Sequence, residues 1–227
     1  PIAPRMTGSS PAERLAAVQD KIAKAAKLAR RSPDALTLIA ISKTHPVEAI
    51  ESLIAAGQCD FGENRVQEAQ AKWQTLRADN PDIRLHLVGQ LQSNKAEEAV
   101  TLFDVIHAVD RPSLVEALVK ASAKLGRRPD CFIQVNIGDE PQKGGCPAVE
   151  LPGLVESARA AGLPVVGLMA LPPVGVEPAP YFALLAKLAR RHGLAGLSMG
   201  MSADFETAVM IGATHVRVGT ALFGERA

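Results

Sequence analysis

Short apolar runs recur along the chain, and between them lie longer stretches whose apolar positions repeat with helical spacing. Runs such as LTLIAIS (36–42) and VVGLMAL (165–171) are apolar at successive positions, which is typical of strands covered on both faces, as in parallel sheets. Eight strands are expected, at Leu36–Ser42, Cys59–Gly62, Leu85–Gly89, Val105–Val109, Cys131–Asn136, Val165–Leu171, Gly196–Met199 and His215–Gly219.

The stretches between these strands have helical character, and a further one precedes the first strand. That first helix is expected from about Pro11 to Arg31, because Ser10 can cap it and Pro11 suits its first turn. The others are expected at Pro46–Ala56, Val66–Ala78, Lys95–Leu102, Pro112–Leu125, Ala148–Ala161, Pro180–Arg191 and Ala203–Ile211. Strict alternation of strand and helix predicts a (β/α)8 TIM barrel with an extra N-terminal helix.

The alternative is an open, doubly wound sheet. No glycine-rich GxGxxG sequence follows the first strand, which weakens the dinucleotide-binding form of that alternative. The length of 227 residues suits one domain with a substantial core, and no linker or shift in composition divides the chain. We expect a single domain over residues 11–227, preceded by a loose leader over residues 1–10.

Composition excludes several classes of protein. A net charge of +1 and an aromatic content of 4% argue against a nucleic-acid partner. No apolar run reaches the length of a membrane span or resembles a signal peptide, so no membrane partner is expected and a cytoplasmic location is the default. Cys59, Cys131 and Cys146 are widely spaced, which predicts neither disulfides nor a metal site.

Polar residues gather where the predicted strands end. They occur at 42–45, 62–65, 89–95, 110–111, 136, 200–202 and 219–220. In a parallel barrel these ends converge on one face, where such folds build their sites. Loops are polar in any case, and capping of the following helices would explain Ser202 and Thr220.

Lys43 ends an apolar strand, which capping does not explain. Ile39, Ile41 and Lys43 share one face of the strand by the two-residue period. If that face points inward, desolvation disfavours the ammonium and leaves a neutral amine that can attack an aldehyde. Alone, Lys43 is better explained as a lysine that reaches solvent at the barrel mouth and pairs with Glu63.

The last two predicted strands favour a chemical role for Lys43 over this structural explanation. Small residues and hydroxyls at Ser202, Gly219 and Thr220 stand where helices begin, and such positions form phosphate sites in barrels. The first strand neighbours the eighth in a closed barrel. An amine beside a phosphate site is the arrangement that a phosphorylated aldehyde requires.

Arg217 belongs to the same strand as His215. Val216 and Val218 suit the helix-facing side, so alternation directs Arg217 into the barrel. A buried guanidinium needs an acceptor, which a pyridine nitrogen could be. Pairing with an internal Asp or Glu remains the alternative.

Several motifs occur in order along the chain: AISKTHP (40–46), FGENRVQEAQAK (61–72), HLVGQLQSNK (86–95) and LSMGMSADFETAVMIGATHVRVGTALFGER (197–226). Together they resemble the pyridoxal phosphate homeostasis protein family, of the proline-synthase co-transcribed type, over roughly residues 11–226. The resemblance implies a barrel similar to the N-terminal domain of alanine racemase that binds pyridoxal 5′-phosphate (PLP).

The resemblance also implies roles for individual residues. It makes Lys43 the Schiff-base lysine, places the phosphate around Ser202, Gly219 and Thr220, and sets Arg217 near the pyridine nitrogen. Asn64 and Ser198 would line the pocket. The family usually has Tyr where this chain has Arg65, and the region 139–180 is compressed and proline-rich, so the pocket rim departs from the family pattern.

Two functions follow from this resemblance. One is a non-catalytic PLP carrier in intracellular vitamin B6 homeostasis, which affects amino-acid balance indirectly. The other is a stand-alone amino-acid racemase, which needs a second acid or base; the chain ends at Ala227 without a further domain, so the carrier is favoured. Expected partners are PLP and apo PLP-dependent enzymes, with the protein a monomer or weak homodimer. Lys72, Lys95 and Lys143 could hold PLP transiently during its transfer, but lysines on helices and loops are mostly solubility features, and they are interpreted as such.

Overall fold

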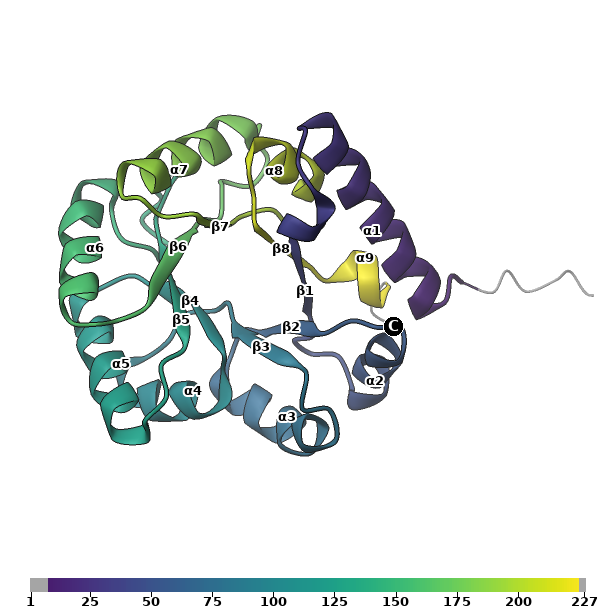
Figure 1. Cartoon of the computed structure of the whole chain (residues 1–227), viewed down its shortest axis with the longest axis horizontal. Helices are drawn as coiled ribbons and strands as arrows, with labels where there is room; N and C mark the ends of the chain where they lie inside the picture. Colours follow the sequence, from purple (N-terminus) through teal and green to yellow (C-terminus); the bar gives the residue numbers. More distant parts are fainter. Residues whose placement is uncertain (1–7, 225–227) are drawn as a thin grey trace, which may run out of the picture.

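Eight parallel strands close into a barrel in the computed structural model, which describes residues 8–224 (Figure 1). Each strand pairs with the next in sequence, and the first pairs with the last. The strands are β1 (Thr37–Ile41), β2 (Asp60–Glu63), β3 (Arg84–Leu87), β4 (Val105–Val109), β5 (Asp130–Gln134), β6 (Val165–Met169), β7 (Gly196–Ser198) and β8 (His215–Val218). The predicted (β/α)8 barrel is confirmed.

Helices surround the barrel. They are α1 (Pro11–Leu28), α2 (Val47–Ala55), α3 (Val66–Asp79), α4 (Ala96–Leu102), α5 (Pro112–Leu125), α6 (Leu151–Ala160), α7 (Ala179–Arg191), α8 (Phe205–Ile211) and α9 (Thr220–Phe223). Single 3-10 turns at Pro33–Ala35, Ser93–Lys95 and Ala148–Glu150 precede β1, α4 and α6. A helix start was expected at Gly219 and Thr220, and α9 begins there; its extent was not predicted, because four residues carry no periodicity.

The N-terminal helix is shorter than predicted. Arg30 has a φ of 56°, in the left-handed region that a right-handed helix cannot continue through, so the helix ends before it. At its start, Ser10 Oγ accepts a hydrogen bond from Glu13 N at 3.1 Å, as the capping pattern predicted. The leader expected over residues 1–10 falls largely on residues 1–7, which lie outside the described range.

The main core lies between the sheet and the helices. Its largest fully buried side chains include Trp73, Phe61, Phe103 and Phe182. The helix α1 contacts α8 and α9, and it packs Leu15, Val18 and Ile22 into the same core beside the junction of β8 and β1. Within the described residues, no helix is both long and apolar enough to cross a membrane.

Side chains of the opposite strand faces fill the barrel interior. Cys131 and Ile133 of β5 belong to the main core, whereas Phe132 between them belongs to a separate small cluster with Val105 and Met169. Phe132 also stacks on His107, with ring centroids 4.6 Å apart. The interior is therefore packed and partly polar.

Asp104, just before β4, joins three parts of the fold. Its carboxylate accepts hydrogen bonds from Leu85 N at 2.8 Å, from Arg77 at 2.7 and 2.8 Å, and from Arg127 at 2.7 Å. Burial by itself would raise the pKa of Asp104, but the bonds from Leu85 and Arg77 and the charge of Arg127 outweigh it and lower that pKa.

We expect Asp104→Asn to lower the free energy of unfolding by about 2 kcal/mol, because hydrogen bonds to an ionised acceptor are stronger than neutral ones. A depressed pKa contributes stability that is present above the pKa of an unfolded aspartate, about 3.9, and is lost as the pH falls through the folded value. The difference between wild type and variant, measured by urea unfolding, should therefore shrink below about pH 4. Asp20→Asn, in an exposed pair with Lys24, is the control and should leave the midpoint unchanged.

Candidate functional site

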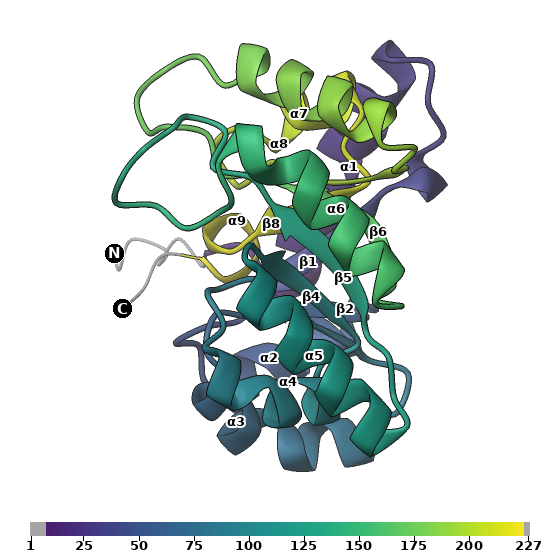
Figure 2. The ribbon, with the colours of Figure 1, turned by 90° about the vertical axis from the view of Figure 1, so that its left-hand side faces the viewer.

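The residues predicted to bind a cofactor come from the ends of four neighbouring strands. Lys43 follows β1, Asn64 follows β2, Ser198 and Ser202 lie at or after the end of β7, and Arg217, Gly219 and Thr220 lie on or after β8. The strand order β7-β8-β1-β2 is continuous, so these ends are adjacent. The loops after β5 and β6 project on the same side of the barrel as α9 (Figure 2).

Pairing of β1 with β8 brings Lys43 towards Gly219. The register aligns Ala40 with Val218, and a Cβ added at Gly219 would lie 3.7 Å from Ile41. Lys43 is two residues beyond Ile41, in a turn, and is partly buried. The predicted adjacency of the first and eighth strands is confirmed.

Side chains of α3 hold the backbone on both sides of Lys43. Lys72 Nζ donates to Ser42 O at 2.7 Å, and Glu68 Oε1 accepts from Thr44 N at 2.6 Å. The bond from Thr44 is the largest cause that lowers the pKa of Glu68, and Lys72 adds to it against the effect of burial. Thr44 has a φ of 63°, which a threonine adopts at a cost, so these bonds stabilise a strained turn.

Glu63 pairs with Lys72 and not with Lys43. Its carboxylate is fully buried and lies 2.7 Å from Lys72 Nζ, and its Oε1 also accepts bonds from Ser42 Oγ and Trp73 Nε1, each at 2.9 Å. Glu63 shares the helix-facing side of β2 with Phe61, whose ring packs on Trp73. The alternative in which Glu63 held Lys43 was therefore wrong, as was the interpretation of Lys72 as a solubility feature.

The loop after β7 and the start of α9 meet at Ser202. Ser202 Oγ accepts from Gly219 N at 3.4 Å, which links two of the residues predicted to hold a phosphate. Gly200 has a φ of 101°, and a Cβ there would lie 2.6 Å from Ala208, so the loop requires glycine. Ser202 does not cap α8, because that helix begins later than predicted and Asp204 Oδ1 accepts from Met201 N instead.

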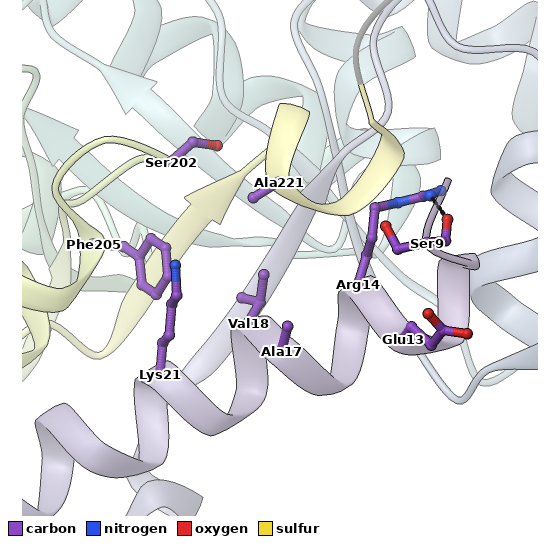
Figure 3. Close-up of a pocket in the computed structure, with 9 residues that line it drawn as sticks. All are labelled: Ser9, Glu13, Arg14, Ala17, Val18, Lys21, Ser202, Phe205 and Ala221. Carbon is purple, nitrogen blue, oxygen red and sulfur yellow. Dashed lines mark hydrogen bonds between the residues drawn. The ribbon is translucent and has the colours of Figure 1, made fainter. Parts of the chain in front are cut away.

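A hollow of about 180 Å³ separates α1 from this loop and α9 (Figure 3). Ser202, Phe205 and Ala221 line one side of it. Arg14 on α1 donates from Nε to Leu222 O at 2.7 Å and also bonds Ser9 O, which attaches the N-terminal helix to α9. The hollow is too small for a whole cofactor, since ligand pockets usually measure about 300 Å³ or more.

A larger hollow, of about 390 Å³, opens at the other end of the barrel, among the strand starts around Thr37 and Asp60. Sites of barrel enzymes lie at the carboxyl ends of the strands. The candidate site is therefore assigned from the chemistry of its side chains and not from the size of a hollow.

Arg217 points into the barrel, as predicted, and is 3% exposed. It donates from Nη1 to Ser198 Oγ at 3.4 Å and from Nη2 to Ala170 O at 3.1 Å. Burial lowers its pKa to about 10, against the opposing charge of Asp204, so it stays a cation at neutral pH. None of the described carboxylates forms an ion pair with it, so the alternative of pairing with an internal Asp or Glu is wrong.

One nitrogen of Arg217 has no hydrogen-bond partner in the part of the chain that the structure describes. Its Nε is buried and has no hydrogen-bond partner among the described residues. Buried donors without partners are rare in proteins, because each costs the free energy of its lost hydration. The described residues therefore leave a buried N–H of Arg217 unsatisfied.

Ser198 and Asn64 occupy different positions in this site. Ser198 is fully buried, and besides Arg217 it contacts His107 Nδ1 at 2.8 Å. Asn64 is partly buried at the strand-end face, and its carbonyl oxygen lies so close to Gly89 that a Cβ there would be 2.2 Å away. Lys143 bonds Glu140 and the carbonyls of Leu171 and Pro172, and so joins the loops after β5 and β6.

Sequence reasoning missed Glu68 and Lys72 as supports of the Lys43 turn, and His107 as a partner of Ser198. The four-residue spacing of Glu68 and Lys72 was a signal for the first pair. The two-residue period from Val105 to His107 was a signal for the second. His86 is fully buried and satisfied by Asp60 and His107, as expected of a core histidine.

The chain matches the family model described as alanine racemase, N-terminal domain, over residues 14–227. An alanine racemase structure from Clostridium difficile 630 has a TM-score of 0.71 at 14% identity and covers 94% of this chain and 57% of that chain. A likeness at that identity concerns the fold alone. It agrees with the expected alanine racemase-like barrel.

Other relatives are much more similar in sequence. The pyridoxal phosphate homeostasis protein of Pseudomonas aeruginosa is 41% identical over 225 residues, which cover 96% of each protein. The structure of PipY from Synechococcus elongatus PCC7942 with PLP bound is 43% identical, with a TM-score of 0.79, and covers 94% of this chain and 100% of that chain. The similarity extends over nearly the full length.

Lys72→Met should leave the buried Glu63 carboxylate without its counter-charge. We expect a loss of about 3 kcal/mol in the free energy of unfolding, measured by urea denaturation. The double variant Lys72→Met/Glu63→Gln removes the buried charge as well and should recover most of the loss. Equal losses in the single and double variants would contradict the ion pair as the cause.

Proposed function

Because the chain belongs to the pyridoxal phosphate homeostasis protein family, we propose that it binds PLP and holds it through Lys43. The Nζ amine adds to the aldehyde carbon of PLP, a C=N double bond replaces the C=O bond, and one water molecule is released. The hydrogen bonds that Lys72 and Glu68 form with the backbone of the Lys43 turn support this role, since they fix the backbone from which the Lys43 side chain extends.

The observation that carries the proposal is the buried Arg217 Nε that lacks a partner among the described residues. The nitrogen of a pyridine ring is an acceptor of the kind this donor requires. A guanidinium in that place keeps the ring nitrogen unprotonated, which makes the bound cofactor a weaker electron sink than one paired with a carboxylate. Arg217 thus suits storage of PLP better than carbanion chemistry.

We assign the phosphate to Ser202, Gly219 and Thr220, beside the β1–β8 junction. Ser202 already bonds Gly219 N, so the two segments that would enclose the phosphate are joined. Asn64 follows β2 at the same face and is partly buried, and we assign it to the lining of the pocket. Ser198 contributes indirectly, through its hydrogen bond with Arg217.

The function that follows is a non-catalytic one: the protein carries or buffers PLP in intracellular vitamin B6 homeostasis, with an indirect effect on amino-acid balance. Racemisation requires a second acid or base opposite the lysine. Tyr181, the single tyrosine of the chain, lies in α7 and packs against the core cluster. Apo PLP-dependent enzymes are the acceptors for delivery.

The first test is of Lys43. Purified protein incubated with PLP should absorb visible light, and borohydride should fix the cofactor on the peptide that contains Lys43. Lys43→Ala should lose both the band and the label. Lys95→Ala, which removes another lysine after a strand end, is the matched control and should keep both. A Lys43→Ala protein that binds PLP as tightly as wild type would overturn the assignment.

The second test separates carrier from racemase. Holoprotein offered each amino acid should show no racemisation or decarboxylation, whereas a turnover of about one per second on any of them is ordinary enzyme speed and would contradict the carrier. Delivery is measured with an apo PLP enzyme, which the holoprotein should reactivate faster than the same concentration of free PLP. An equal rate would exclude delivery.

A further inference from the structure

A chain of hydrogen bonds crosses the barrel interior from Arg217 to the opposite end of the barrel. Its links are Arg217 Nη1 to Ser198 Oγ at 3.4 Å, Ser198 Oγ to His107 Nδ1 at 2.8 Å, His107 Nε2 to His86 Nδ1 at 2.9 Å, and His86 Nε2 to Asp60 Oδ1 at 2.7 Å. We call these five residues the interior relay. Four of them are buried, and the Asp60 side chain is 20% exposed at the strand starts.

The two ends of the interior relay determine its direction. A guanidinium only donates hydrogen bonds and a carboxylate only accepts them. With neutral histidines, one arrangement satisfies every link: Arg217 donates to Ser198, the Ser198 hydroxyl donates to His107 Nδ1, and each histidine donates from Nε2. The hydrogens then all point from the site towards Asp60.

The surroundings keep His107 and His215 neutral. Burial lowers the pKa of His107 well below the ordinary value of a histidine, and the nearby His86 and His215 lower it further. Burial also lowers the pKa of His215, which contacts both rings edge-on, to about 4. Among the described residues, no group of His, Cys, Asp and Glu is arranged to hold a metal ion. We therefore look for the role of the interior relay at its two ends, Arg217 and Asp60.

We propose that Asp60, His86, His107 and Ser198 are positioning residues that hold the Arg217 guanidinium in one orientation. The interior relay and Ala170 O each accept one hydrogen bond from an Nη group, whereas Nε is the one guanidinium nitrogen with no partner among the described residues, and we assign its N–H to a ligand. The role of that donor towards PLP rests on the proposed function. The orientation of Arg217 does not rest on the proposed function, because the chain shows that orientation without a ligand.

The first experiment is nitrogen NMR of the histidine and arginine side chains in the protein without PLP. His107 and His86 should both carry hydrogen on Nε2 alone, and the Arg217 Nε–H signal should be sharp and protected from exchange. Hydrogen on His107 Nδ1, or an Arg217 Nε–H that exchanges as fast as that of an exposed arginine, would overturn the proposal.

Two variants test the relay as a unit. In Asp60→Asn the amide both donates and accepts, so either direction is allowed and both histidines should become mixtures of tautomers. Ser198→Ala removes the link to Arg217 and should lose the exchange protection of its Nε–H. Asp130→Asn, at the start of β5 and outside the interior relay, is the matched control and should change neither signal. Asp60→Asn and Asp130→Asn spectra that both match wild type would contradict a relay anchored on Asp60.

The link to the cofactor is measured separately, as the dissociation constant of PLP and the position of its absorption band. Ser198→Ala should weaken PLP binding about tenfold and shift the band, the effect of one misplaced hydrogen bond to the ring. Normal PLP binding by a Ser198→Ala protein with a mobile Arg217 would overturn the positioning role. If wild type failed to bind PLP at Lys43, the proposed function would fail, while the tautomer and exchange signals would still decide the orientation of Arg217.

Discussion

Parallel pairing of β1 with β8 is the interaction on which the candidate site depends. Without this closure, Lys43 would stand at the edge of an open sheet, far from the loops after β7 and β8. The register that sets Ala40 opposite Val218 also sets the end of β1 beside Gly219. Residues almost 180 positions apart in sequence thereby come to share one small region, and α1 covers the junction from outside through its contacts with α8 and α9.

Two polar networks, on opposite faces of the strands, then support the site. Outside the barrel, Glu63 and Lys72 form a buried ion pair between β2 and α3 that fixes the Lys43 turn. Inside, Ser198 and the histidines below it hold Arg217. Each network consists of groups that would be costly to bury alone, and strand alternation brings its members to the same face, where most of their polar atoms are paired. One network positions the amine, and the other positions the guanidinium.

Much of this was predictable, for local reasons. The strands and helices followed from periodicity, and their ends shifted by up to three residues where the local backbone decided, as at Arg30 and Asp204. Arg217 was correctly directed inward, because Val216 and Val218 require the helix-facing side. The partner of Lys72 was not predicted, since whether Glu63 faces α3 or the interior depends on the β2 register and on Trp73. The start of α9 was expected at Gly219 and Thr220, but its extent was not, because four residues are too few to show a helical period.

By itself the sequence determined the order of elements, the barrel and the residue types at each strand end, because hydrophobic periodicity and turn chemistry are local properties. It also placed Lys43, Ser202, Gly219 and Thr220 on one face. Only the tertiary structure decided which polar groups satisfy one another. Three features depend on distances between strands, which residue spacing along one chain does not encode. They are the Arg217 Nε without a partner among the described residues, the Glu63 side chain that faces outward, and the hydrogen-bonded path to Asp60.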